Sequence, residues 1–260
     1  MKRPFGQHFL FDLNILKKIV QCSGLLPDDT VVEIGPGAGT LTKVLASSAK
    51  KVIAIEFDKK LTGRLKENLS SRDNVEIVTA DALKFPYDTI QGSFKVVANI
   101  PYYITTPLIF KILEFREKVP SMTLLMQKEV AKRIVAQPGG KEYGVLSISL
   151  QMYTKPELKF TVSRKAFSPP PDVNSAVVHF DVSPFPLFQV HDEALFRDIV
   201  KSAFSQRRKT LLNSLMKFQG IRDSLMRAGI DPGLRPENLN IENFARLANT
   251  LKLENDTAEK

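Results

Sequence analysis

Short, almost wholly apolar runs alternate with amphipathic stretches through the first two thirds of the chain. The apolar runs predict seven strands, near Val31–Gly35, Lys51–Glu56, Val75–Thr79, Lys95–Asn99, Met122–Met126, Val145–Tyr153 and Ser175–Val182. The amphipathic stretches predict helices near Leu13–Cys22, Thr40–Ala49, Lys59–Leu69, Pro107–Phe115 and Lys128–Ala136. Apolar strands separated by helices are typical of a mostly parallel sheet covered on both faces. The last two predicted strands lack a full crossover helix between them, so we expect an antiparallel, hairpin-like pair there.

The pattern changes after the sequence SPFPLF. Pro184 and Pro186 indicate a linker, and from Asp192 onward the periodicity is helical without strands. Helices are predicted near Glu193–Ala203, Lys209–Phe218, Ile221–Ala228 and Ile241–Leu251. We therefore expect an α/β domain at residues 1–187 and a small all-helical domain at residues 188–260, with a frayed tail from Glu254.

The composition is that of a folded chain with few special chemical groups. Its 260 residues, 43% of them hydrophobic, suffice for a sizeable core. No apolar run is long enough to cross a bilayer, and the N-terminal MKRPFGQHFLFD lacks the apolar segment of a signal peptide. The chain has one cysteine, Cys22, and three histidines, without HExxH or CxxC spacing. We expect a cytoplasmic, monomeric protein with no metal and no membrane partner.

Positive charge is in excess, with 37 Lys and Arg residues against 28 Asp and Glu residues and a formal net charge of +9. The surplus gathers in three clusters: Lys128, Lys132 and Arg133; Lys155, Lys159, Arg164 and Lys165; and Lys201, Arg207, Arg208 and Lys209. The charge alone is equally compatible with a basic protein that has no polyanionic partner. Clusters at several places favour an extended groove for a polyanion, with nucleic acid the first candidate.

Glycines and acids follow three successive predicted strands. In VVEIGPGAGTLTKVL, Gly35, Gly37 and Gly39 come after the first strand and before a helix, where glycine lets the backbone approach a ligand closely. Their GxGxG spacing differs from the GxGxxG of dinucleotide-binding proteins, which disfavours an NAD-type oxidoreductase. Glu56 ends the second strand and Asp81 ends the third, so both acids are expected beside the glycines, suited to ribose hydroxyls and to an adenine amine. A plain turn and two helix caps are the alternative interpretation.

This arrangement resembles the S-adenosylmethionine-dependent methyltransferases of the Rossmann-like class. The resemblance implies a class I methyltransferase fold, with a mostly parallel seven-stranded sheet, to which the small helical domain is attached here. It implies S-adenosylmethionine as the cofactor, without a metal. The cofactor-binding residues of this part of the chain would be Gly35, Gly37, Gly39, Glu56 and Asp81.

The fourth predicted strand ends in the sequence VVANIPYYITTP. Asn99–Ile100–Pro101–Tyr102 resembles the [DNS]PP[YFW]-type motif of amino methyltransferases, in the NLPY/NIPY form of rRNA adenine N6-methyltransferases. On that resemblance all four residues are catalytic and Asn99 also contacts the cofactor. The Asn99 amide and a backbone carbonyl would accept hydrogen bonds from adenine N6 and direct its lone pair at the methyl group. Pro101 would fix the turn and Tyr102 would stack on the flipped base, whereas Tyr103 is expected only to pack.

Two further segments carry the same resemblance. GQHFLFDLNILKKIV resembles the GQ[NH]FL segment that closes over the cofactor in rRNA dimethyltransferases, which implies that His8 and Leu10 contact S-adenosylmethionine. AFSPPPDVNSAVVHF resembles their F-x-P-x-P-x-V-x-S-A-V-V segment. In that segment Phe167 would form a second aromatic wall opposite Tyr102.

The C-terminal sequences RRKTLLNSL and AGIDPGLRPENLNIENFARLAN resemble the KsgA-type small-subunit rRNA adenine dimethyltransferases, so the resemblance runs from Phe5 to about Asn249. It implies dimethylation at N6 of two adjacent adenines in the 3′-terminal hairpin of small-subunit rRNA, within an immature subunit, as part of small-subunit biogenesis. The helical domain and the basic clusters would hold rRNA phosphates. The alternatives are an Erm-type large-subunit rRNA methyltransferase, a DNA adenine N6-methyltransferase and a non-catalytic rRNA-binding assembly factor.

Overall fold

The computed structural model describes residues 8–206 and 208–258. Contacts divide the chain into two compact units, each with its own hydrophobic core. The first unit holds the described residues up to Ala131 together with Lys155–Pro184. The second unit holds Lys132–Thr154 and the chain from Phe185 onward. Residues 132–154, which were predicted to belong with the sheet, thus make their contacts within the helical unit.

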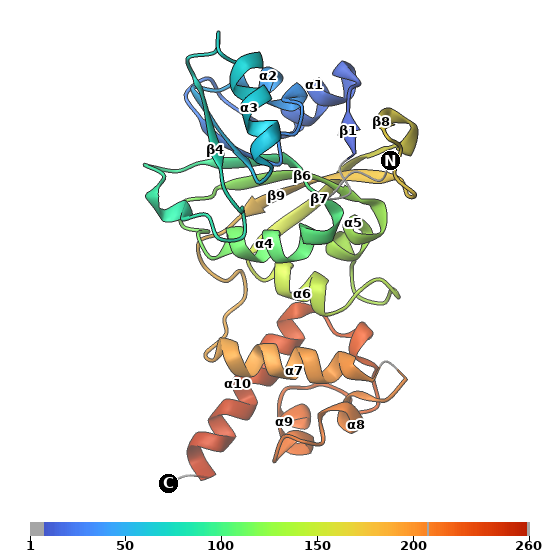
Figure 1. Cartoon of the computed structure of the whole chain (residues 1–260). Helices are drawn as coiled ribbons and strands as arrows, with labels where there is room; N and C mark the ends of the chain where they lie inside the picture. The colour runs from blue at the N-terminus through green and yellow to red at the C-terminus, as the bar shows by residue number, and fades with distance from the viewer. Residues whose placement is uncertain (1–7, 207, 259–260) are drawn as a thin grey trace. The chain divides into compact units, whose positions relative to one another are not determined.

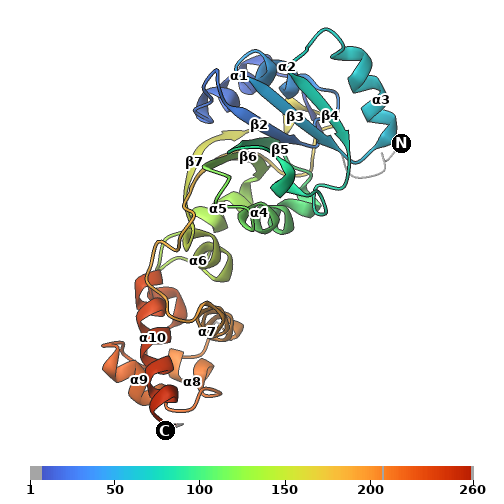
Figure 2. The same ribbon diagram turned by 90° about the vertical axis from the view of Figure 1, so that its left-hand side faces the viewer.

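The first unit is built on a mixed sheet of seven strands (Figures 1 and 2). Their order is β4 (Val75–Thr79), β3 (Lys51–Glu56), β2 (Thr30–Ile34), β5 (Lys95–Asn99), β6 (Ser121–Gln127), β9 (Ser175–Val182) and β7 (Thr154–Val162). The pairs from β4 through β6 are parallel, and β9 is antiparallel to β6. A separate two-stranded sheet pairs β1 (Phe9–Leu10) with β8 (Phe167–Ser168). The prediction of a mostly parallel seven-stranded sheet is confirmed.

Helices cover both faces of this sheet because its central strands are apolar on both sides. Val31, Val32, Val96 and Val97 are completely buried. On one face lie α1 (Leu13–Cys22), α2 (Thr40–Ala46) and α3 (Lys59–Asn68), and on the other lies α4 (Thr105–Leu113) (Figures 1 and 2). Short 3₁₀ helices span Tyr87–Thr89, Tyr102–Ile104, Arg164–Ala166 and Pro236–Asn238.

Helix α1 illustrates how the local sequence sets these elements. The Asp12 side chain accepts hydrogen bonds from the backbone amides of Asn14 and Ile15 and so begins the helix. Leu16, Ile19 and Val20 recur at helical spacing, are buried, and join the core cluster beside the sheet. No helix within residues 8–206 and 208–258 combines the length and the apolar character needed to cross a bilayer.

The second unit is helical. Its helices are α6 (Val145–Gln151), α7 (Glu193–Ser205), α8 (Leu211–Leu215), α9 (Ile221–Arg227) and α10 (Ile241–Ala258), and α5 (Lys128–Val135) ends within it. Ile199, Leu215, Leu225 and Phe244 are fully buried in its core. The four helices predicted after the linker are all present, but α10 continues to Ala258, where the sequence predicted a frayed tail from Glu254.

The strand predicted at Val145–Tyr153 is wrong, because these residues form α6. The alternation V-L-S-I-S-L imitates a strand, yet the decisive polar residues lie four apart, on one face of a helix. Ser147 Oγ donates to Arg133 O at 2.7 Å. Gln151 Nε2 donates to Ile134 O and Ala136 O at 2.8 and 3.0 Å.

The missed strand is β7, whose Pro156 is tolerated because β7 is at the edge of the sheet. The other six predicted strands are confirmed, with ends shifted by at most one residue.

We expect Gln151→Ala to lower the free energy of unfolding by about 1–2 kcal/mol, since two backbone carbonyls at the end of α5 lose their donor. Urea denaturation of the variant and of the wild-type protein measures the difference. Gln219→Ala, at an exposed position of the same unit, is the matched control and should change little. Equal midpoints for wild type and Gln151→Ala would contradict the assigned role.

Candidate functional site

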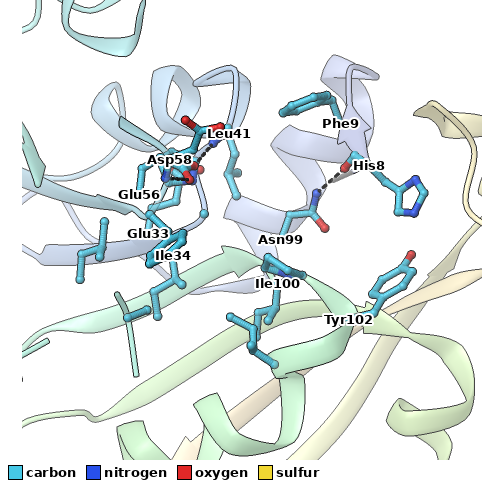
Figure 3. Close-up of a pocket in the computed structure, with 18 of the residues that line it drawn as sticks. His8, Phe9, Glu33, Ile34, Leu41, Glu56, Asp58, Asn99, Ile100 and Tyr102 are labelled. Carbon is cyan, nitrogen blue, oxygen red and sulfur yellow. Dashed lines mark hydrogen bonds between the residues drawn. The ribbon is translucent and has the colours of Figure 1, made fainter. Parts of the chain in front are cut away.

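A pocket of about 330 Å³ opens where four parallel strands end (Figure 3), a volume typical of small-molecule sites. Its lining comes from the loops after β2, β3, β4 and β5, and from the N-terminal segment. The predicted site residues that line it are His8, Leu10, Gly35, Gly37, Glu56, Asp81, Asn99, Ile100, Pro101 and Tyr102. Gly39 and Phe167, which were predicted with them, are absent from this lining.

Positions 35 and 37 require glycine, because of their backbone conformation and because neighbouring side chains lie close. Both have positive φ, +67° and +57°, which side chains other than hydrogen rarely tolerate. A Cβ on Gly35 would lie 3.5 Å from the Cδ atom of Pro101, so the glycine loop and the Asn99–Tyr102 segment touch. A Cβ on Gly37 would lie 2.5 Å from Cε1 of Phe9, so the N-terminal segment closes directly over this loop.

Gly39 has a packing role, and its predicted contact with the cofactor stays a prediction. It is the N-cap of α2, with φ of +79°, and a Cβ there would lie 2.8 Å from Cδ2 of Leu65 in α3. The position is glycine because α2 and α3 pack closely at this point. Nothing in the pocket lining requires a cofactor contact from it.

Glu56 is held by backbone amides. Its side chain is 3% exposed, its Oε2 accepts from Gly37 N at 3.1 Å and its Oε1 accepts from Asp58 N at 3.0 Å. Each carboxylate oxygen keeps a further lone pair for a ligand. Asp81 is less buried, and its Oδ1 accepts from Leu83 N at 2.9 Å. Both acids are therefore oriented before any ligand arrives.

Glu33 is a pocket residue that the sequence analysis missed. It lies within β2, is 2% exposed and lines the pocket, and its Oε2 has no hydrogen-bond partner among the described residues. Burial raises the pKa of its carboxyl to about 8; the Thr42 hydroxyl opposes the rise and the negative charge of Glu56 adds to it. An acid inside the apolar run VVEIG was the signal that could have identified it.

Asn99, Ile100, Pro101 and Tyr102 follow β5 directly. Asn99 Nδ2 donates to the backbone carbonyl of His8 at 3.2 Å, as Figure 3 shows, while no described residue donates to its Oδ1. The Tyr102 hydroxyl is 2.7 Å from Ser175 Oγ in β9, which fixes the direction of the half-buried ring. Burial raises the pKa of this hydroxyl, and the Ser175 contact acts in the opposite direction.

The N-terminal segment lies along the pocket. The Leu10 carbonyl accepts from Thr40 Oγ1 at 3.0 Å, and Leu10 pairs with Phe167 in the β1–β8 sheet. His8 Nδ1 is 2.8 Å from the Pro169 carbonyl. Of the predicted GQ[NH]FL segment, Gly6 and Gln7 lie outside the described part of the chain.

Two further aromatic side chains, Phe167 and Tyr103, have contrasting environments. Phe167 is 4% exposed and packs in the core cluster with Leu10, Leu16 and Leu41. Strand alternation turns Phe167 inward and Ser168 outward, and Phe167 is not among the residues that line the pocket, so its role opposite Tyr102 stays a prediction. Tyr103 lines the pocket yet is 63% exposed, so it is not a packing residue. Burial and the nearby charges of Asp81 and Glu56 raise its pKa.

Residues 1–253 match the family described as ribosomal RNA adenine dimethylase. The chain belongs to that family. Among its relatives, the ribosomal RNA small subunit methyltransferase A of Moorella thermoacetica is 45% identical, covering 96% of this chain and 92% of that protein. The protein of the same name from Caldanaerobacter subterraneus is also 45% identical, covering 97% of each.

Two solved structures have folds similar to that of this chain. A dimethyladenosine transferase from Plasmodium falciparum has a TM-score of 0.80 and 28% identity, covering 95% of this chain and 98% of that one. The 23S rRNA methyltransferase ErmE has a TM-score of 0.76 and 28% identity, covering 94% and 99%. The rRNA adenine dimethyltransferase family and the Rossmann-like methyltransferase fold that the sequence motifs predicted are thus confirmed.

The raised pKa of Glu33 predicts how the free energy of unfolding of the ligand-free protein depends on pH. The folded-state pKa of about 8 exceeds the ordinary value of 4.5, so the stability associated with the protonated form is complete below pH 4.5 and is lost as pH rises through 8. Relative to Glu33→Gln, the wild-type protein should lose about 1.4 kcal/mol of unfolding free energy per pH unit between about pH 5 and 8.

Urea denaturation of both proteins at several pH values measures this difference. Glu67→Gln, at an exposed position of α3, is the control and should follow the wild-type curve. Parallel curves for wild type and Glu33→Gln would show that the Glu33 carboxyl is already ionised at neutral pH in the folded protein.

Proposed function

We propose that this protein transfers methyl groups from S-adenosylmethionine to N6 of two adjacent adenines in the 3′-terminal hairpin of small-subunit rRNA. The rRNA would be presented within an immature subunit in the cytoplasm, and the protein would act as a monomer. The observation that carries the proposal is that one pocket holds both the buried carboxylate of Glu56 and the carboxamide of Asn99. The first suits a nucleoside cofactor and the second suits an adenine amine.

The pocket residues fit S-adenosylmethionine. Glu33 Oε2 is buried in the pocket and has no hydrogen-bond partner among the residues that the structure describes, and a buried acid is stabilised by a cationic ligand such as a sulfonium or an ammonium group. Glu56 would accept from the ribose hydroxyls and Asp81 from the adenine amine. Gly35, Gly37 and Leu10 would hold the cofactor by their backbones. When bound, S-adenosylmethionine supplies a methyl group on an electrophilic sulfonium.

Two acceptors of this chain would orient the attacking nitrogen. The lone pair of adenine N6 is delocalised into the ring, so the amine is a weak nucleophile. Asn99 Oδ1 and the Ile100 carbonyl receive no hydrogen bond from any described residue, so both can accept the N6 hydrogens. Hydrogen bonds to them would favour a tetrahedral nitrogen and leave its lone pair directed at the methyl carbon. Pro101, with φ of −56°, fixes the direction of the carbonyl before it.

Tyr102 would hold the flipped base. Stacking of a base on an aromatic ring typically contributes about 1–3 kcal/mol, comparable with the few kcal/mol needed to unstack the base. Because the Ser175 contact fixes the hydroxyl, the ring is held ready for stacking.

The relatives favour small-subunit rRNA over the alternative targets. Proteins named for small-subunit rRNA are 45% identical to this chain, whereas the structure named for 23S rRNA is 28% identical. Exposed basic side chains suit rRNA phosphates in both units: Arg164 and Lys165 in the first, and Lys132, Arg133, Lys201, Arg208 and Lys209 in the second. Arg207, predicted with them, lies outside the described residues.

Primer extension across the 3′ end of small-subunit rRNA tests the proposal. Immature small subunits treated with the protein and S-adenosylmethionine should give stops at two neighbouring adenines. Large subunits and duplex DNA, treated in parallel, should incorporate no methyl label. Stops in large-subunit rRNA would instead support an Erm-type activity, and labelled DNA a DNA methyltransferase.

Asn99→Ala should lower kcat by about 100-fold, in the range for removing one group that stabilises a transition state. Affinity for S-adenosylmethionine, measured by calorimetry, should fall far less, because the hydrogen bonds to N6 form only with the target base. Steady-state methylation of immature subunits gives kcat. A loss of cofactor affinity as large as the loss of kcat would mean that Asn99 is chiefly a cofactor ligand.

A further inference from the structure

Two consecutive tyrosines follow β5, and their side chains have different surroundings. The ring of Tyr102 is half-buried, and its hydroxyl lies 2.7 Å from Ser175 Oγ in β9. Tyr103 is 63% exposed, although it lines the pocket. Burial, and then the negative charges of Asp81 and Glu56, raise the pKa of its hydroxyl. Because the effect of a charge falls off with distance, Tyr103 lies near the acids of the pocket, whereas Tyr102 is held by β9.

The acids and Tyr103 reach the pocket from opposite sides of β2. The strand order is β4, β3, β2 and β5. Asp81 follows β4 and Glu56 ends β3, while Tyr103 follows β5. A ligand bound by both acids would therefore lie between them and the ring of Tyr103. Figure 3 shows Glu56 and Tyr102 on opposite sides of Asn99, so the ligand of Glu56 belongs to the half of the pocket away from Tyr102.

The backbone that carries Tyr103 is anchored, although its ring is exposed. Tyr102–Ile104 is a short 3₁₀ helix, in which the backbone amide of Ile104 donates to the Pro101 carbonyl at 3.1 Å. Thr105, which begins α4, is 2% exposed. An exposed ring in a pocket has apolar faces in water, and burying them under a ligand is favourable. These features are typical of a binding residue rather than of a residue that only packs.

We propose that Tyr103 binds the cofactor, with its ring packed against the adenosine part of S-adenosylmethionine. This inference rests on the proposed function, in which Glu56 accepts from the ribose hydroxyls and Asp81 accepts from the adenine amine. The adenosine would span the two acids, so a ring that lies near both of them would lie against the nucleoside. An aromatic ring suits this contact because it can stack on a base and loses little conformational freedom in doing so.

One segment of five residues, Asn99–Tyr103, would then contact both substrates of the reaction. Tyr102 and the two acceptors before Pro101 would hold the target adenine, and Tyr103 would hold the cofactor. Pro101 and the short helix after it fix the backbone between these positions. The separation of the two ligands would therefore be set within this segment, and two adjacent tyrosines would bind two different molecules.

Substitutions at the two tyrosines separate their roles. Affinity for S-adenosylmethionine is measured by calorimetry, and kcat/KM is measured on immature small subunits. We expect Tyr103→Ala to weaken cofactor binding about tenfold, the loss of roughly one base–aromatic stack, and Tyr103→Phe to stay within about threefold of wild type. Tyr102→Ala should keep cofactor affinity within about twofold and lower kcat/KM. Phe110→Ala is the control and should match wild type, since Phe110 is a partly exposed ring of α4 that does not line the pocket.

Fluorescence gives a second reading that does not depend on activity. The chain contains no tryptophan, so Tyr103→Trp would carry a single indole at the position in question. Adenosine and S-adenosylmethionine should each quench its emission, because a stacked adenine quenches an indole, whereas methionine alone should not. Phe110→Trp, treated in the same way, should show no change with any of the three compounds.

Equal cofactor affinity in wild type and Tyr103→Ala would overturn the proposal, as would an indole at position 103 that adenosine does not quench. Unchanged affinity with a lowered kcat/KM in Tyr103→Ala would make Tyr103 a contact for rRNA instead. The proposed function fails separately: wild-type protein that binds S-adenosylmethionine but gives no paired stops on small-subunit rRNA would refute it and leave the cofactor contact standing.

Discussion

Parallel pairing of β4, β3, β2 and β5 brings the carboxyl ends of four strands to one edge of the sheet. The register of the strands aligns these ends closely, since Ile34 of β2 lies opposite Ile55 of β3 and Glu56 of β3 lies opposite Thr79 of β4. The residues that follow each strand therefore meet although they are far apart in the chain. Every other feature of the site depends on this constraint, because no single loop contains both an acid for a ribose and an amide for an adenine.

Contacts among the loops hold the edge in one arrangement. Gly35 lies against Pro101, and the Glu56 carboxylate accepts amides from two different loops, at Gly37 and at Asp58. The arrangement has an energetic cost, since Glu33 and Glu56 are both buried and burial raises the pKa of Glu33 to about 8. A cationic ligand would offset that cost. Under the proposed function, the sulfonium of the cofactor would be that ligand.

The target side of the pocket is organised around Asn99. Its Nδ2 donates to the His8 carbonyl, and the ring of His8 contacts Tyr102. The N-terminal segment thus helps to orient the amide to which the proposed function assigns catalysis, and it also closes over Gly37 through Phe9. The two sides of the pocket are thus joined through this segment. The second unit carries exposed lysines and arginines, which would contact rRNA phosphates under the proposed function.

By itself, the sequence determined those helices and strands whose pattern of apolar and polar residues fits only one type of element. Apolar runs between helices predicted six strands of the sheet, and the residues at strand ends, from Gly35 to Asn99, predicted the pocket edge because parallel strands must end together. Tertiary structure alone decided the rest. The run at residues 145–151 became helix α6 because Ser147 and Gln151 bond to the end of α5. Phe167 turned into the core, and His8 came to face Tyr102, because the pairing of β1 with β8 sets which side chains point inward. Such contacts join residues of different elements, and local periodicity carries no information about them.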